Sequence, residues 1–277
     1  MTQQAGPDGV ASATEIGLSA KEAAVPPPSA VPHPATGARD AARARDAAGW
    51  AAKVDRLQVD QRDGVRGTNV AGRRLTGPVQ GFGKMYQKTY QMAVGPEIEP
   101  AAAIALWRAH FPDFWPVGNR FAGALTGINP GDVALLDLAV GGGVKLSTGV
   151  FVLYADAESF TLMTPQGHMF AGWITFSAER QAGVTVVQAQ VLMRASDPLY
   201  EIGMILGGHQ KEDKFWIATL LALGERLAVP DAQVTARTVC VDSSRQWRHA
   251  GNVRHNSMIA STLQTLTAPV RYLARRR

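Results

Sequence analysis

The chain has 277 residues, 46% of them hydrophobic, which is enough to bury the core of a domain of about 150 residues. No apolar run approaches the roughly 18 to 20 residues of a membrane-spanning helix, and the single cysteine, Cys240, cannot form an internal disulfide. We therefore expect a cytoplasmic protein rather than an integral helical membrane protein or a disulfide-stabilised scaffold.

The net charge of +5 is unevenly distributed along the chain. Residues 237–277 hold eight arginines and one acid, Asp242, so they carry +7 and leave −2 for the rest of the chain. The high isoelectric point therefore belongs to the C-terminal region and does not predict a basic binding surface elsewhere.

The N-terminal region predicts little packed structure. Residues 1 to about 40 are rich in Ala, Pro, Gly and Ser and lack apolar periodicity, which is typical of disorder. Residues 41–57 favour helix because alanine is abundant. We expect residues 1–60 to form a disordered or weakly helical extension, and residues 61–82, dense in Arg and Gly, to form a linker.

The next segment predicts a strand, a helix and an irregular run. In residues 86–94 one set of alternate positions is more polar than the other, as in a strand with one buried face. Residues 101–110 favour a short helix. Residues 111–131 are irregular and contain Trp115 and Phe121, which either cover a cavity or pack under a long loop.

A series of strands follows, predicted over residues 133–140, 149–154, 159–164, 170–178 and 185–193. In the last two, apolar residues occupy every second position, so each predicts a half-buried antiparallel strand. The order of the strands predicts a meander.

A long helix is predicted after Asp197-Pro198. Apolar residues there recur at a spacing of three and four, which places them on one face: Leu199, Ile202, Leu206, Trp216, Leu220, Leu223 and Leu227. Gly207-Gly208 interrupts this helix.

The run Met-Thr-Pro-Gln-Gly-His-Met-Phe-Ala-Gly-Trp at residues 163–173, with the strand pair and helix that follow, resembles the C-terminal half of the helix-grip (SRPBCC) superfamily. That superfamily includes START lipid-transfer, Bet v 1-like and polyketide-cyclase-like domains, and the chain is most similar to a bacterial branch. The resemblance covers about residues 83–229. It implies an α+β fold in which a curved antiparallel sheet wraps around a long C-terminal helix and encloses an apolar cavity.

The resemblance also implies which side chains contact a ligand. We expect the cavity to be lined by aromatic and aliphatic residues on the inner faces of these elements: Tyr90, Trp115, Phe121, Phe170, Ile174, Phe176, Val187, Trp216 and Leu220. The interruption at Gly207-Gly208 departs from a single straight gripping helix.

Three side chains are candidates for catalysis. His168 lies at a strand entrance, and His209 precedes Asp213 by four residues, so the carboxylate could orient the imidazole as a general base requires. The same spacing suits a capping arrangement at a helix start, without catalysis. Two further acids, Glu201 and Glu212, are expected to be solvated helix charges.

Other chemical motifs are absent from the sequence. The triplet at residues 141–143 fits no phosphate-binding pattern, and a Gly-x-Ser-x-Gly elbow does not occur. The spacing of Cys240, His249 and His255 matches no metal motif, so we expect neither a metal site nor a cofactor.

Residues 230–277 are predicted to form a basic tail that contains an amphipathic helix over residues 256–277. Its apolar face consists of Ile259, Leu263, Leu266, Val270 and Leu273. This face either docks on the domain or a second subunit, or binds an anionic membrane surface, which would make the protein membrane-peripheral. We expect no nucleic-acid partner, because no recognition motif surrounds the tail aromatics.

Three functions remain open at this point. The first is binding of an apolar small molecule, lipid-like or polyketide-like, in the cavity. The alternative is a cyclase- or hydrolase-like enzyme on the same scaffold that uses His168 or His209. The third is an interaction protein recruited to a membrane or a partner through its tail.

Overall fold

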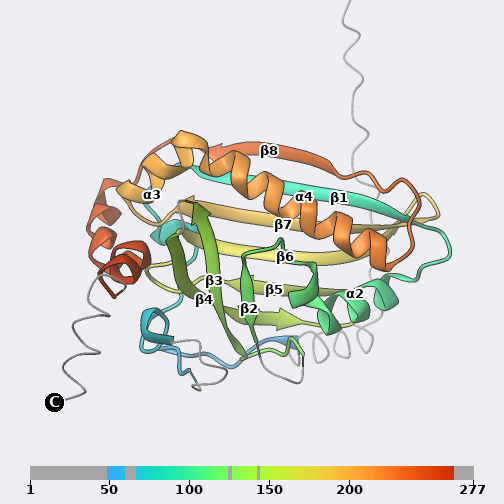
Figure 1. Cartoon of the computed structure of the whole chain (residues 1–277), viewed down its shortest axis with the longest axis horizontal. Coiled ribbons are helices and arrows are strands. Elements are labelled where there is room, and N and C mark those ends of the chain that lie inside the picture. The colour runs from blue at the N-terminus through green and yellow to red at the C-terminus, as the bar shows by residue number, and fades with distance from the viewer. Residues whose placement is uncertain (1–48, 60–66, 124–126, 142–143, 265–277) are drawn as a thin grey trace, which may run out of the picture. The chain divides into compact units, whose positions relative to one another are not determined.

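The computed structural model describes residues 49–59, 67–123, 127–141 and 144–264, which belong to a compact unit spanning residues 41–277. It contains an eight-stranded antiparallel sheet in the order β2-β3-β4-β5-β6-β7-β1-β8 (Figure 1). The strands are β1 (Met85–Gly95), β2 (Arg120–Ala122), β3 (Val133–Gly141), β4 (Val144–Ala155), β5 (Ser159–Met163), β6 (Phe170–Gln181), β7 (Val184–Ala195) and β8 (Thr235–Asp242).

Helices α2 and α4 lie across one face of this curved sheet (Figure 1). The helices are α2 (Pro100–Ala109), α3 (Pro198–Gly203) and α4 (His209–Arg226), with a π-helical turn η4 (Met204–Gly208) between α3 and α4. Short 3-10 helices are η1 (Gly67–Asn69), η2 (Pro78–Gln80), η3 (Phe111–Phe114) and η5 (Trp247–His255), and residues 257–264 are helical. The strand order from β2 to β7 and then β1, gripping α4, confirms the predicted α+β helix-grip class.

In the hairpin β6-β7, the apolar residues of the period-two pattern are the ones buried beneath the helices. Its register pairs Phe176 with Ala189, and both are fully buried on the helix-facing side. The two-residue turn Ala182-Gly183 has positive φ at both positions (49° and 84°), the backbone twist that suits a tight hairpin.

The helical stretch after β7 is divided. Asp197 caps α3 by accepting hydrogen bonds from the N–H groups of the next turn, and Gly207, at φ 108°, breaks the helical path. The expected single apolar face is therefore wrong. Leu220 and Leu223 on α4 are fully buried, but the residues expected to continue this face before the break, Leu199, Ile202 and Leu206, are 48%, 54% and 80% exposed.

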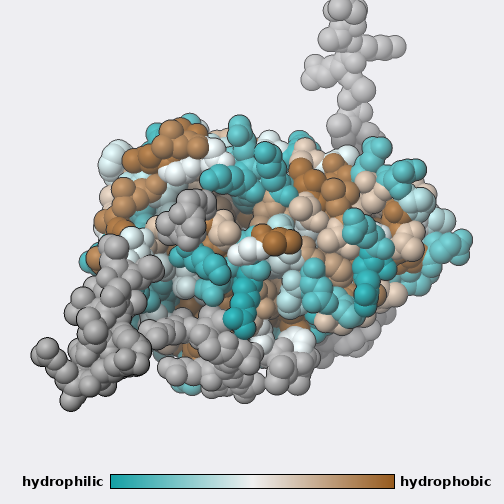
Figure 2. All heavy atoms as spheres, viewed as in Figure 1, coloured by the Kyte–Doolittle hydropathy of each residue, from teal (hydrophilic) through white to brown (hydrophobic). Residues whose placement is uncertain are grey.

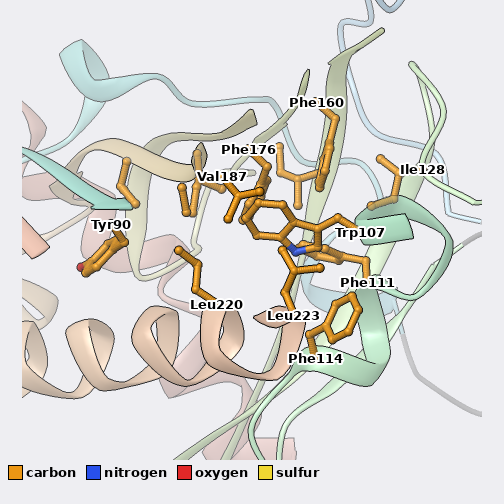
Figure 3. Close-up of a cluster of buried hydrophobic side chains, with 14 of the residues drawn as sticks. Tyr90, Trp107, Phe111, Phe114, Ile128, Phe160, Phe176, Val187, Leu220 and Leu223 are labelled. Carbon is orange, nitrogen blue, oxygen red and sulfur yellow. The ribbon is translucent and has the colours of Figure 1, made fainter. Parts of the chain in front are cut away.

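The end of the sheet covered by α2 and η3 is solidly packed (Figure 3). Trp107 of α2 is fully buried, with its ring 5.0 Å from that of Phe176, and Phe111 of η3 lies 5.4 Å from Phe160. Leu223 of α4 belongs to the same cluster. Edge-to-face aromatic packing of this kind stabilises the core at this end of the sheet.

The residues before β1 pack against the sheet, in contrast to the predicted linker and helical extension. Residues 50–59 form no helix, and their Leu57 clusters with Val70, Leu135 and Phe151. β3 and β4 turn apolar side chains to their outer face, which needs such a cover. In the described part, residues 67–82 are therefore a packed segment.

The folded unit also extends past the predicted boundary at residue 229. Strand β8 pairs with β1 along Met85–Gln91 and adds an eighth strand to the sheet. Residues 243–264, which we call the strap, then cross back to the start of α3. Gln246 N donates to Phe82 O (2.7 Å), and Ser257 N donates to Gly167 O (3.0 Å).

The helix at residues 257–264 turns a polar face, not an apolar one, toward the fold. Ser257 and Ser261 are buried, whereas Ile259 and Leu263 are 41% and 56% exposed. The rest of the predicted apolar face, Leu266, Val270 and Leu273, lies outside the described residues. Within the part of the chain that the structure describes, no helix combines the length and hydrophobicity needed to cross a bilayer.

Candidate functional site

A cavity of about 380 Å³ lies between the sheet and the N-terminal half of α4, next to the aromatic cluster: its lining residue Trp115 packs against Phe111. Its size is at the low end of the ~300–1,000 Å³ typical of small-molecule sites. Its apolar lining includes Leu136, Leu138, Val150, Leu162, Phe170, Ile174, Val191, Met193, Met204, Phe215, Trp216 and Met258. Its polar lining consists of Asn119, Thr164, His168, Tyr200, Lys211 and Glu212.

Four of the nine predicted ligand-contacting residues line this cavity: Trp115, Phe170, Ile174 and Trp216. The other five, Tyr90, Phe121, Phe176, Val187 and Leu220, lie in the hydrophobic core. Two of the five, Phe176 and Phe121, are covered by the aromatic side chains of α2 and η3, whereas Tyr90 bonds to Asp213 of α4. The sequence pattern predicts which residues of a strand face inward. It does not predict which of these residues pack in the core and which line a cavity.

Turn η4 contributes Met204, Leu206 and Gly208 to the cavity lining, and Leu206 is also strongly exposed. The cavity therefore reaches the surface at the break between α3 and α4. Hydrophobic side chains gather over α3 and η4 (Figure 2), among them Ile202 and Ile205.

A buried charge cluster adjoins the cavity beneath α4. Lys88 of β1 is 1% exposed, and its Nζ donates to Asp213 Oδ1 (2.7 Å) and to His209 O (3.3 Å). The same Nζ lies 3.0 Å from Glu212 Oε2, within ion-pair distance. Tyr90 OH donates to Asp213 Oδ1 (2.7 Å), and burial, followed by the nearby carboxylates, raises the pKa of this phenol.

Glu212 is the member of this cluster that also lines the cavity. It is 8% exposed, which corrects the expectation of a solvated charge, and neither carboxyl oxygen receives a hydrogen bond of good geometry. Burial raises the pKa of Glu212 to about 7, with Lys88 opposing the shift. Glu201 was also expected in solvent, but it is buried and pairs with Arg245 of the strap (3.0 Å).

The predicted His209–Asp213 arrangement is not formed. Asp213 Oδ1 accepts from Lys88 and Tyr90, and His209 Nδ1 is buried without a hydrogen-bond partner. The His209 ring packs against Tyr86 (4.6 Å between centroids), and burial, with Lys88 nearby, lowers its pKa. His209 therefore lacks the oriented carboxylate that the general-base hypothesis required.

His168 lines the cavity and is also held by its own turn. Its Nδ1 accepts a hydrogen bond from Phe170 N (3.0 Å), which fixes the proton of the neutral ring on Nε2. Burial lowers the pKa of His168 to about 4, so the ring is neutral at physiological pH.

The strap forms part of the cavity wall. Asn256 Nδ2 donates to Asp197 Oδ2 (2.8 Å), while Asp197 Oδ1 caps α3. Two residues later, Met258 N donates to Tyr200 OH (3.0 Å), and both of these residues line the cavity. The region predicted to be a tail thus supplies a wall of the site.

Among the described residues, no three His, Cys, Asp or Glu side chains are grouped so that they could hold a metal ion.

Comparison with known proteins finds distant resemblances. No protein-family model and no curated protein matches the chain. Among solved structures, it resembles the di-domain aromatase/cyclase StfQ from the steffimycin biosynthetic pathway (12% identity, TM-score 0.38), over 53% of this chain and 50% of StfQ. It also resembles major latex-like protein 151 from Panax ginseng (9%, 0.36, 52% of this chain and 98% of that one). A third is protein NE0264 from Nitrosomonas europaea (14%, 0.35, 52% and 94%).

The chain thus spans about half the length of StfQ. At these levels of similarity, the strand order and the gripping helix of this chain define its class, and the site must be interpreted from its own residues.

Proposed function

We propose that this protein binds an apolar small molecule in the cavity between the sheet and α4. The observation that carries the proposal is the cavity itself: about 380 Å³, walled mainly by aliphatic and aromatic side chains, with a few polar groups converging on it. Its modest volume suits a compact ligand, such as a molecule of one or two fused rings or a short acyl chain. A ligand of this kind gains free energy by leaving water, at about 25 cal/mol per Å² of apolar surface.

The first test is binding of N-phenyl-1-naphthylamine, an uncharged fluorescent probe. We expect saturable binding with a Kd in the micromolar range, which corresponds to about 8 kcal/mol. The variant Val191→Phe places extra volume in the cavity wall and should weaken binding about tenfold or more.

The matched control is Val241→Phe, the same exchange at a half-exposed position on β8 that does not line the cavity. It should leave the Kd unchanged. Absence of binding to the unmodified protein, or equal binding by folded Val191→Phe, would contradict the proposal.

Recruitment through the C-terminal region stays a prediction, because residues 265–277 lie outside the described structure.

A further inference from the structure

Glu212 is the side chain that the apolar cavity does not explain. It is a carboxyl group more than nine-tenths buried; Lys88 Nζ lies 3.0 Å from its Oε2, but neither oxygen accepts a hydrogen bond of good geometry. A buried polar group whose hydrogen bonds are not made destabilises the fold, so such groups usually meet a protein group, a water molecule or a ligand. Glu212 lines the cavity, so a bound molecule can form the hydrogen bond that the ion pair with Lys88 does not supply.

The charges around Glu212 do not balance when it is ionised. One cation, Lys88, lies within ion-pair distance of two carboxylates, 2.7 Å from Asp213 and 3.0 Å from Glu212. Asp213 also accepts from Tyr90 OH, so it is the better-satisfied anion of the two. A protonated Glu212 leaves one cation and one anion, whereas an ionised Glu212 adds an uncompensated negative charge in a buried place.

The other titratable groups near Glu212 do not remove this imbalance. On α4, burial and Lys88 lower the pKa of His209, which disfavours a second cation there. At the β5-β6 turn, His168 is neutral for the same desolvation reason, and on α3 burial raises the pKa of Tyr200. Lys211 is a cation that lines the cavity, but its Nζ donates to Val140 O (3.4 Å) near the surface and forms no ion pair with Glu212. Tyr86 of β1 faces His209, and burial raises its pKa.

We propose that Glu212 anchors the ligand: it binds in the protonated form and donates a hydrogen bond to the carbonyl oxygen of a neutral, apolar molecule, taking up a proton as that molecule enters. This inference rests on the proposed function and adds the ligand class, an uncharged compound with a carbonyl group. The proton comes from solvent, and no covalent bond is made or broken.

The physical reason is desolvation. A ligand that fills the cavity removes water from beside Glu212, which penalises the carboxylate and favours the neutral acid. The neutral acid can then donate to a carbonyl, which the carboxylate cannot do. Because the pKa of Glu212 in the empty protein is about 7, ligand that binds only the protonated form should bind about tenfold more weakly at pH 8 than at pH 6.

The test uses prodan, a neutral naphthalene ketone, titrated at pH 6, 7 and 8. The Kd of the unmodified protein should rise about tenfold across this range. In Glu212→Gln, which stays uncharged at every pH, the Kd should be independent of pH. The control Glu225→Gln makes the same exchange at an exposed position on α4 and should retain the full pH dependence.

Calorimetry on the unmodified protein gives a second readout that needs no variant. Titrations with prodan at pH 7, in buffers of different ionisation enthalpy, should show uptake of about half a proton per ligand, since a group with a pKa near 7 is half-protonated before binding.

The outcomes separate the two proposals. If N-phenyl-1-naphthylamine and prodan both bind, but without proton uptake, or if folded Glu212→Gln keeps the pH dependence, the role of Glu212 is overturned and the cavity function stands. Affinity that increases with pH would also overturn it, since it means that the ionised form binds. If neither probe binds at any pH, the proposed function itself fails.

Discussion

Because His168 is buried, it makes the free energy of unfolding depend on pH. Its pKa falls from 6.5 in the unfolded chain to about 4 in the fold. Above pH 6.5 the ring is neutral in both states. Between pH 6.5 and 4 the unfolded state binds more protons, so stability is lost as the pH falls.

Replacing His168 with Asn should remove this part of the acid sensitivity, because the Asn carboxamide oxygen can still accept from Phe170 N. Between pH 7 and 4.5 the unmodified protein should lose about 2 kcal/mol more unfolding free energy than His168→Asn. Urea unfolding at the two pH values measures the difference. His249→Asn, in η5, serves as the control and should resemble the unmodified protein; equal acid losses in all three proteins would refute the argument.

Lys88 shows which part of the candidate site could be predicted from the sequence. It shares the inner face of β1 with Tyr90 and Met92, so a buried cation, and therefore a carboxylate partner, could have been expected there. That reasoning would have singled out Glu212 and Asp213. The spacing of His209 and Asp213 instead predicted a pair that is not formed. Asp213 binds Lys88 and Tyr90 of β1, and the spacing of residues along a helix does not show which groups of a neighbouring strand they meet.

At the scale of the elements, the break between α3 and α4 determines the cavity mouth. Gly207 has a left-handed backbone at φ 108°, and an added Cβ would meet no atom within 4 Å. Gly203, four residues earlier, has helical angles (φ −59°, ψ −38°) and equally open surroundings. The two glycines therefore form a matched pair that differs only in backbone conformation.

Gly207→Ala should destabilise the protein by about 1–2 kcal/mol, the cost of a side chain in the left-handed region. Gly203→Ala should stabilise it by up to ~1 kcal/mol, because alanine loses less entropy in a helix. Thermal melts of both variants check the pair. If both variants shift the melting temperature in the same direction, the left-handed backbone at Gly207 does not penalise a side chain, and the prediction is wrong.

The elements also show where sequence patterns succeed and fail. Strands β6 and β7 were predictable because one face of each strand is buried and the alternation is clear. Strand β8 was missed because almost all of Thr235–Asp242 is exposed, so no buried face marks it; its β-branched residues, Val239 and Val241 among them, were the available signal. The predicted apolar face from Leu199 to Leu227 spans Gly207-Gly208. The helix breaks at this glycine pair, so the apolar residues before it are exposed.

At the scale of the whole molecule, the N-terminal boundary of the fold can be located by truncation. Residues 49–59 pair with β4, where Ala51 N donates to Leu153 O (2.9 Å), and bury Leu57 at 2% exposure. Deleting residues 1–59 should remove this cover and lower the melting temperature by about 5–10 °C, as expected for the loss of a buried leucine and its neighbours.

Deleting only residues 1–48 should leave the melting temperature within about 2 °C, since most of this segment is rich in Ala, Pro, Gly and Ser and offers little to a core. Equal melting temperatures for the two truncated proteins would show that the segment at residues 49–59 does not stabilise the sheet.

The position of β1 in the sheet has a consequence for the order in which the protein is synthesised. β1 is the first strand made, yet its neighbours are β7 and β8, which follow about 100 and about 150 residues later. At ~5–20 residues per second, β1 waits on the order of 5 to 20 s for β7 and longer for β8. Throughout that interval both edges of β1, and its apolar face with Tyr90 and Met92, have no strand to pair with. The nascent chain thus carries a strand with two unpaired edges through roughly a third to a half of its translation, an interval in which such a strand is exposed to pairing with other chains.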